Sequence, residues 1–228
     1  HSSFDVRVAQ RYHTRLTLRN AKVKEITPVI EQIRPIEPIA TEIVKAVEPT
    51  EIVKATTAGE VRSIDVITSV VDRMQKVNPK LNAIVCDLSD EALKTAELLD
   101  RARNNGKECG PLHGVPVTIK INVDQKGHST SNGVLALKDW MAPDDAPVVK
   151  NLKNAGAIII GRTNTPEFSF RADTDNELYG RTNNPWGGHV SAGGSSGGAG
   201  AAVMSGMGAL GHGNDIGGSL RFPAAANG

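Results

Sequence analysis

Glycine is concentrated at the C-terminal end of this 228-residue chain, and this distribution constrains the fold more than any other sequence feature. Fourteen of the 23 glycines fall in residues 187–228, and between Val190 and Gly228 the charged residues are Asp215 and Arg221. Glycine accepts backbone conformations and close approaches that other residues do not. The segment is therefore expected to contain tight turns and closely packed small residues.

Residues 1–55, at the N-terminal end, have a different character. Four of the 12 prolines stand at positions 28, 35, 38 and 49, and the hexapeptide TEIVKA occurs twice, at Thr41–Ala46 and Thr50–Ala55. The apolar residues of this region follow helical spacing, but Pro35 and Pro38 would interrupt a continuous helix. Residues 1–47 are predicted to form a proline-interrupted arm that packs on its own chain, with a dimer interface as the alternative.

The middle of the chain alternates between helical and strand-like patterns. In chain order, the apolar spacing predicts a helix over 61–77 that Ser63 caps and Asn78-Pro79 ends, a helix following Asp90 and Glu91, a strand over 115–121, a short helix near 148–152 and a strand over 157–161. Such alternation is typical of an α/β fold around a mixed or mostly parallel sheet.

The overall composition excludes several classes of function. The chain has 26 Lys and Arg against 25 Asp and Glu, and a formal net charge of only +1 argues against a protein that binds the nucleic-acid backbone. Cys86 and Cys109 are too few and too isolated for a disulfide scaffold or a zinc site, and the six histidines show no metal-ligand spacing. No stretch approaches the ~20 apolar residues of a membrane span. We expect a cytoplasmic protein without metal, cofactor, nucleic-acid or membrane partner.

Two glycine motifs give weak signals. Gly206 to Gly211 fits the G-x-G-x-x-G dinucleotide fingerprint, but a helix-like segment precedes it where a strand is needed, so the match is interpreted as chance. Gly193 to Gly197 fits G-x-S-x-G, which would make Ser195 a nucleophile. The later residues His212 and Asp215 stand in the wrong order for that triad. A glycine-rich turn into a helix explains this second motif about as well as catalysis does.

A third motif, Gly217-Gly218-Ser219, suggests an oxyanion site. Adjacent glycines allow consecutive backbone N–H groups to converge on one point beside the Ser219 hydroxyl. Taken alone, the tripeptide is a weak signal and is more typical of a tight turn with a solvent-exposed serine.

Taken together, three segments resemble the amidase signature family: GVPVTIK at 114–120, GGSSGG at 193–198 and DIGGSLRFPA at 215–224. The intervening AGAIIIGRTNTPEF at 155–168 also fits, and Ser219 follows Ser195 by the family's usual 24 residues. The resemblance covers residues 48–228. It implies an α/β domain whose mixed β-sheet core is covered by helices, incomplete at the C-terminus because family members are usually about twice as long.

The resemblance also implies a Ser–cis-Ser–Lys triad. Ser219 would attack an amide carbonyl, and Ser195, after a cis peptide bond, would bridge it to Lys120 as the general base. An ordinary lysine, with a pKa near 10.4, is only about 0.04% neutral at pH 7. Burial on the apolar strand would lower that pKa and make base catalysis feasible. The implied oxyanion hole consists of the backbone N–H groups of Ile216, Gly217, Gly218 and Ser219.

The implied activity is hydrolysis of a carboxamide, with release of ammonia or an amine and a small-molecule amide as substrate. The glutaminase (A) subunit of a glutamyl-tRNA amidotransferase is the first alternative, although that subunit usually reads DTGGSIRQP where this chain has DIGGSLRFP. A non-catalytic interaction protein that reuses the fold is the second. Ala192, Asn214 and Ile121 depart from the common family pattern. The substrate-binding residues and the identity of the amide stay open, as does the choice between a homodimer and a missing C-terminal portion.

Overall fold

The computed structural model of the protein describes residues 48–228. The predicted N-terminal arm, residues 1–47, and the first TEIVKA copy lie outside the described residues. The second copy, Thr50–Ala55, lies within helix α3.

Helices and strands alternate along the described chain, as the apolar spacing predicts. The elements are α3 (Pro49–Ala58), α4 (Ser63–Leu81), β1 (Ile84–Asp87), α5 (Ser89–Asn104), β2 (Pro116–Lys120), η1 (Leu135–Leu137), α6 (Pro147–Asn154), β3 (Ile158–Thr163), η2 (Glu167–Ser169), α7 (Gly197–Met204), β4 (Leu210–Gly211) and α8 (Arg221–Asn227).

The four strands form one mixed sheet in the order β1-β3-β2-β4. Strand β2 runs parallel to both β3 and β4, whereas β1 runs antiparallel to β3. The expected α/β architecture around a mixed sheet is therefore confirmed. Because β2 is a central strand with neighbours on both sides, all five of its residues are buried.

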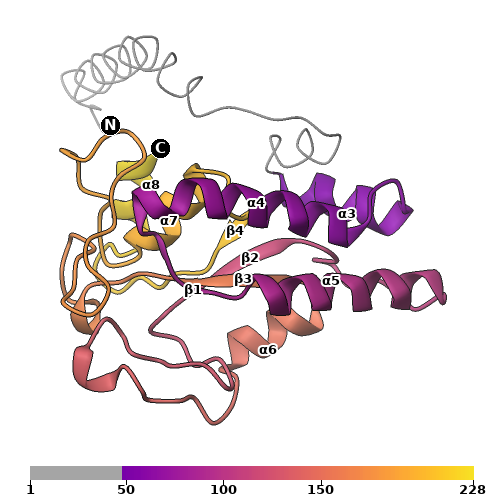
Figure 1. Ribbon diagram of the computed structural model, residues 1–228, viewed down its shortest axis with the longest axis horizontal. Coiled ribbons are helices and arrows are strands. Elements are labelled where there is room, and N and C mark those ends of the chain that lie inside the picture. Colours follow the sequence, from indigo (N-terminus) through magenta and orange to yellow (C-terminus); the bar gives the residue numbers. More distant parts are fainter. Residues whose placement is uncertain (1–47) are drawn as a thin grey trace, which may run out of the picture. The chain divides into compact units, whose positions relative to one another are not determined.

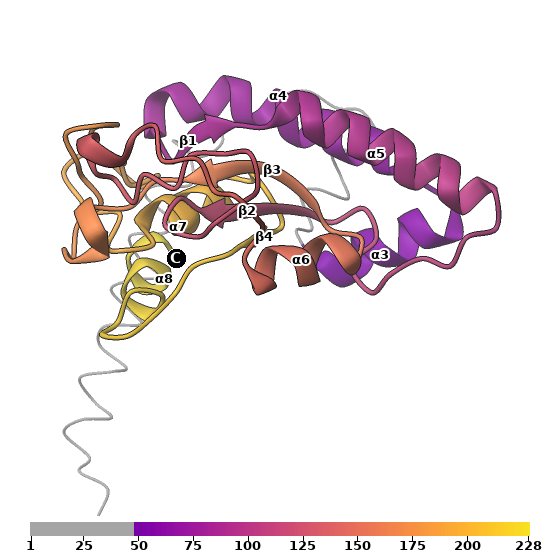
Figure 2. The same ribbon diagram turned by 90° about the horizontal axis from the view of Figure 1, so that it is seen from below.

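Helices cover both faces of the sheet. In β3, Ile158 and Ile160 pack in one cluster with residues of α4 and α5, while Ile159 packs in another cluster with Val149 of α6. This alternation follows from the two-residue period of a strand. Figures 1 and 2 show α4 and α6 on opposite sides of the strands.

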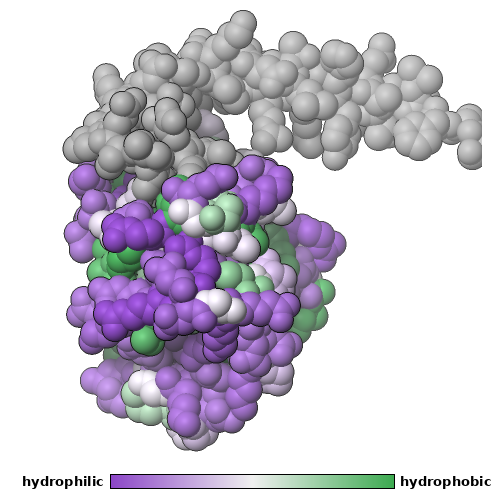
Figure 3. All heavy atoms as spheres, turned by 90° about the vertical axis from the view of Figure 1, so that its right-hand side faces the viewer, coloured by the Kyte–Doolittle hydropathy of each residue, from purple (hydrophilic) through white to green (hydrophobic). Residues whose placement is uncertain are grey.

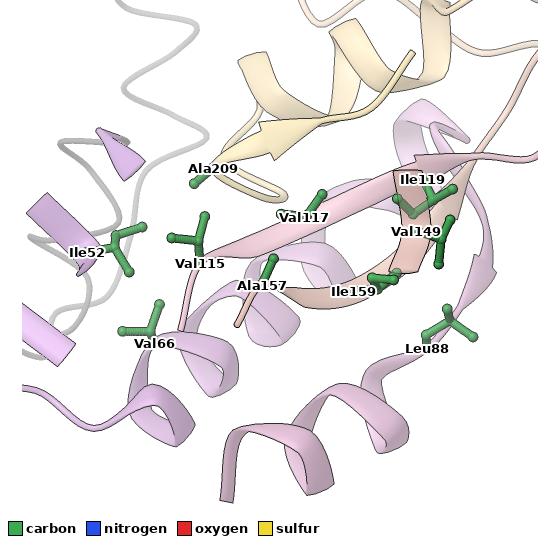
Figure 4. Packing of buried hydrophobic residues seen from close by; sticks show 10 residues of the cluster. All are labelled: Ile52, Val66, Leu88, Val115, Val117, Ile119, Val149, Ala157, Ile159 and Ala209. Atoms are coloured by element: carbon green, nitrogen blue, oxygen red, sulfur yellow. The ribbon is translucent and has the colours of Figure 1, made fainter. Parts of the chain in front are cut away.

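The largest hydrophobic cluster runs along β2. Figure 4 shows Val115, Val117 and Ile119 spaced along this strand, with Ile52 of α3 and Val66 of α4 near its beginning. These apolar residues occupy alternate positions, so the intervening Thr118 and Lys120 side chains face away from them. The strand thereby carries a lysine into the interior.

Helix α4 differs from the prediction at both ends. Ser63 does not cap it: the N–H groups of Ser63 and Ile64 donate to the Asp100 carboxylate of α5, at 2.8 and 3.0 Å. The helix also continues through Pro79 to Leu81. Asn78 Oδ1 accepts the N–H groups of the two residues that follow Asn82, which fixes the turn into β1. A long-range hydrogen bond thus overrides the local capping signal at the start of α4, and local hydrogen bonds to Asn78 follow its end.

The outer surface at the α3–α5 end of the domain is mostly hydrophilic. Figure 3 shows this face with small, separate hydrophobic areas. Among the helices of residues 48–228, none has both the length and the apolar composition needed to cross a membrane.

Candidate active site

Lys120 is the last residue of β2, and its side chain is 0% exposed. The residue lies where β2 leaves the sheet, beside the loop that precedes α7 and the loop that follows β4. The predicted burial of this lysine is confirmed. Burial of an amine without compensation is costly, so its hydrogen-bond partners decide what it can do.

Three side-chain oxygen atoms surround the Lys120 amine. Its Nζ lies 2.6 Å from Ser195 Oγ, 2.8 Å from Asn214 Oδ1 and 3.1 Å from Ser196 Oγ. Among residues 48–228, no carboxylate forms an ion pair with it. The amine is thus held by neutral partners, which do not lock it in its charged form.

Burial lowers the pKa of Lys120 from its ordinary value of 10.5 to about 8, and the nearby Asp215 carboxylate opposes this shift. The cause is desolvation, because removal of water disfavours the charged ammonium. A lysine with this pKa is partly neutral near pH 7 and can accept a proton.

Ser195 lies on the loop before α7, and the Gly194–Ser195 peptide bond is cis, as the resemblance implies. Its side chain is 1% exposed. Thr174 holds the loop on both sides: its Oγ1 donates to the Gly193 carbonyl at 2.8 Å and accepts the Gly197 N–H at 3.1 Å. A Cβ on Gly194 would lie 2.3 Å from the Arg171 carbonyl oxygen, so only glycine fits there.

The loop before α8 is organised around Asp215. Its carboxylate accepts backbone N–H groups of Gly218 at 2.7 Å and Leu220 at 3.1 Å. It also accepts both Nε and Nη2 of Arg221, at 3.0 and 2.9 Å. The Arg221 guanidinium, followed by the Gly218 N–H, holds the pKa of Asp215 well below its usual range. Asp215 therefore serves as a fixed anion around which the glycine loop folds.

Ser219 lies on this loop, next to the one that carries Ser195. The two loops are joined by a hydrogen bond from the Ser196 N–H to the Ser219 carbonyl at 3.2 Å. Within the described residues, the Ser219 hydroxyl itself makes no hydrogen bond to Ser195. The structure thus brings Lys120 and Ser195 into direct contact and places Ser219 on the adjoining loop.

The four backbone N–H groups expected in an oxyanion hole divide into two kinds. Those of Ile216, Gly217 and Ser219 have no acceptor in residues 48–228. The Gly218 N–H, in contrast, is bound to Asp215 and is not free for a ligand. The expectation for Gly218 is therefore corrected: its N–H orders the loop.

The structure does not support the other functions that the glycine-rich motifs could indicate. The Gly206–Gly211 segment follows α7 and leads into β4, so it lacks the strand-to-helix context of a dinucleotide site. His212 does not bond to Ser195, whose oxygen contacts Lys120 instead. Across the described part of the chain, no group of three His, Cys, Asp or Glu side chains could hold a metal ion.

Two contacts of Lys120 are not evident from the sequence. There, Asn214 stands out only as a departure from the family pattern, and Ser196 only as part of the glycine-rich motif. The signal that could have pointed to them is their place next to residues of the expected motifs. Asn214 directly precedes Asp215, and Ser196 directly follows Ser195. Their contact with a lysine more than 70 positions earlier becomes visible only in the fold.

Comparison with known proteins settles the family. The profile of the amidase family matches residues 65–228, which is more than half of the chain. This chain belongs to the amidase family. The recognition of amidase signature motifs is confirmed, since the similar solved structures include an aryl acylamidase of the amidase signature family.

Three relatives illustrate the range of similarity. The chain is 60% identical over 171 residues to an indoleacetamide hydrolase of Bradyrhizobium diazoefficiens, covering 75% of this chain and 33% of the relative. It is 40% identical over 167 residues to the A subunit of the glutamyl-tRNA(Gln) amidotransferase from Endomicrobium trichonymphae, covering 73% and 34%. A fatty acid amide hydrolase structure superposes with a TM-score of 0.81 at 34% identity, covering 85% and 34%. The chain thus spans about a third of the length of these relatives.

Proposed function

We propose that this chain carries the nucleophile, the base and the oxyanion-binding backbone of an amidohydrolase. The protein would cleave a carboxamide C–N bond through a serine acyl-enzyme. The observation that carries the proposal is the 2.6 Å hydrogen bond between Lys120 Nζ and Ser195 Oγ, both buried beside the Ser219 loop. Membership of the amidase family supports the assignment of Ser219 as the nucleophile.

In the acylation step, Ser219 Oγ forms a bond to the amide carbonyl carbon. The Ser219 proton passes to Ser195 Oγ as the Ser195 proton passes to neutral Lys120, which becomes an ammonium ion. Negative charge develops on the carbonyl oxygen and is stabilised by the free N–H groups of Ile216, Gly217 and Ser219.

Collapse of this intermediate breaks the C–N bond. The Lys120 ammonium returns its proton through Ser195 to the departing nitrogen, which leaves as ammonia or an amine. Water then attacks the acyl-enzyme by the same proton route, and the carboxylic acid is released. The Ser219 hydroxyl must rotate towards Ser195 for this sequence to begin.

For the substrate, we propose a small primary carboxamide with an apolar acyl group. The relative with 60% identity is an indoleacetamide hydrolase. Three apolar residues around Ser219, namely Ile216, Leu220 and Phe222, are exposed and offer an apolar surface to an acyl group. A cytoplasmic location completes the proposal, and the free thiols of Cys86 and Cys109 are compatible with it.

Ammonia release from indole-3-acetamide and from glutamine tests this proposal. We expect release from indole-3-acetamide to exceed release from glutamine, and Ser219→Ala to lower it by on the order of 10⁴-fold or more. Ser69→Ala, a half-buried serine of α4, is the matched control and should leave the rate unchanged.

Other outcomes favour the alternatives. Release from glutamine alone, dependent on added amidotransferase subunits, would support the glutaminase subunit. Release that survives Ser219→Ala would contradict the nucleophile assignment. Absence of hydrolysis together with partner binding that survives alanine at Lys120, Ser195 and Ser219 would support a non-catalytic interaction protein.

A further inference from the structure

Lys120 has two side-chain partners, Ser196 and Asn214, besides the Ser195 through which the proposed relay passes. We propose that Asn214 is a positioning residue whose amide oxygen holds one N–H of neutral Lys120, so that the amine lone pair faces Ser195. The inference rests on the proposed function of Lys120 as a base. It assigns a role to one of the three positions where this chain departs from the common family pattern.

The proton count around the amine carries the argument. A neutral lysine has two N–H groups and one lone pair, and Asn214 Oδ1, 2.8 Å away, can only accept. Ser196 Oγ donates its own proton to the Asn214 carbonyl at 3.4 Å, so towards the amine, 3.1 Å away, it acts as an acceptor. Both N–H groups of Lys120 are then used. The lone pair is left for Ser195 Oγ, at 2.6 Å.

A chain of hydrogen bonds fixes the orientation of the Asn214 amide. Asn214 Nδ2 donates to Asn122 Oδ1 at 3.2 Å, and Asn122 Nδ2 donates to Ser169 Oγ at 3.1 Å. Ser169 Oγ in turn donates to Asn132 Oδ1 at 3.1 Å. In this arrangement the Asn214 amide oxygen faces Lys120 and its amide nitrogen faces Asn122.

The far end of this chain is anchored in the backbone. Asn132 and Ser169 both have left-handed backbone conformations, with φ of 50° and 61°. The Asn132 carbonyl accepts the Phe168 N–H at 3.0 Å, which ties the two loops together. Such conformations persist only where the surroundings hold them. The amide chain is thus attached to two ordered loops rather than to solvent.

The direction of the lone pair decides whether Ser195 can accept the Ser219 proton. With both N–H groups held, the Ser195 proton points to the amine and its oxygen is free on the other side. Without Asn214, the amine can rotate and donate to Ser195 instead, which blocks the relay. Two further titratable groups act on this amine: Asp215 favours its charged form, and His212 is close enough that the Lys120 charge, after burial, lowers the pKa of the imidazole.

The first test follows Lys120 itself by NMR, with lysine labelled by ¹³C at Cε and the resonance assigned through Lys120→Met. Asn214→Asp places a charge beside the amine and should raise the titration midpoint by about one to two pH units. Asn214→Leu removes an acceptor that favours the ammonium and should lower the midpoint. Asn105→Asp, which adds the same charge at an exposed position after α5, is the control.

The second test is the rate of fluorophosphonate labelling from pH 6 to 10. Asn214→Asp keeps an acceptor at the same place, so labelling should fall about 10- to 100-fold at pH 7 and recover at pH 10. Asn214→Leu should label about tenfold more slowly even at pH 10, where Lys120 is fully neutral, because the lone pair is no longer directed.

The results separate this inference from the function it rests on. A Lys120 midpoint that stays at the wild-type value in both variants, or an Asn214→Leu labelling rate equal to wild type at pH 10, would overturn the role of Asn214. Failure of the wild-type protein to label at any pH would instead contradict the proposed function, while the NMR midpoints would still decide the Asn214–Lys120 contact.

Discussion

At the scale of single residues, the site depends on how Lys120 is buried. A pKa of about 8 leaves roughly one lysine in eleven neutral at pH 7, whereas the ordinary value of 10.5 leaves about one in 3,000. The pKa can stay this low because the hydrogen-bond partners of the amine, Ser195, Ser196 and Asn214, add no negative charge beside it. Asp215 lies close enough to oppose the shift, but its charge is already shared with Arg221.

The same pKa predicts the pH dependence of the nucleophile. Fluorophosphonate labelling of the wild-type protein should rise with pH, with a midpoint near 8, because only neutral Lys120 can take up a proton. The sign follows from the shift: below the midpoint the lysine is charged and the rate falls about tenfold per pH unit. A rate independent of pH between 6 and 9, or a midpoint near 10.5, would contradict the assignment of Lys120 as the base.

The sequence could predict Lys120 and Ser195 because both lie in motifs with characteristic neighbours, and the structure confirms the burial of one and the cis bond of the other. It could not predict the Asn214 contact. That contact joins residues 94 positions apart. Nor could the sequence show that the Gly218 N–H donates to Asp215. A glycine-rich turn is compatible both with an N–H bound within the loop and with one free to bind an oxyanion.

At the scale of elements, α5 holds the ends of the two helices that precede it. Asp100 accepts the first N–H groups of α4, and Arg103 Nη1 donates to the Thr56 carbonyl near the end of α3 at 2.6 Å. Helix ends leave unpaired backbone groups, and these two side chains satisfy them from another element. The packing of α4 against the sheet, and hence the shape of the core under β2, depends on this support.

Asp100→Ala should therefore lower the free energy of unfolding by about 1–3 kcal/mol, because it leaves N–H groups at the buried start of α4 without an acceptor. Urea denaturation monitored by circular dichroism measures the change. Asp72→Ala, at an exposed position in the middle of α4, is the control and should stay within about 0.5 kcal/mol of wild type. Equal stability of the two variants would show that Asp100 does not support the helix.

Helices α4, α5 and α6 and strands β2 and β3 are predictable because their apolar spacing is local information. The ends of α4 are not: a distant carboxylate replaces the local cap at Ser63, and the helix continues past Pro79 to Leu81, whose carbonyl accepts the Asn183 N–H. Ser63 Oγ is itself buried without a partner among the described residues. Capping by a carboxylate 37 positions away leaves no pattern in the local sequence.

At the scale of the whole molecule, the fold brings three distant segments to one place. The end of β2, the loop before α7 and the loop before α8 meet at Lys120, Ser195 and Ser219, and the amidase family match covers all three. The mixed sheet supplies the meeting point, because β2 lies between β3 and β4. The matched relatives are about three times as long as the aligned region.

Intact-mass spectrometry after fluorophosphonate treatment tests whether Lys120 and Ser195 activate Ser219. We predict one adduct on the wild-type chain, none on Ser219→Ala and strongly slowed labelling of Ser195→Ala. An adduct that persists on Ser219→Ala and disappears on Ser195→Ala would make Ser195 the nucleophile. That result, or a wild-type chain that takes up no adduct, would contradict the account.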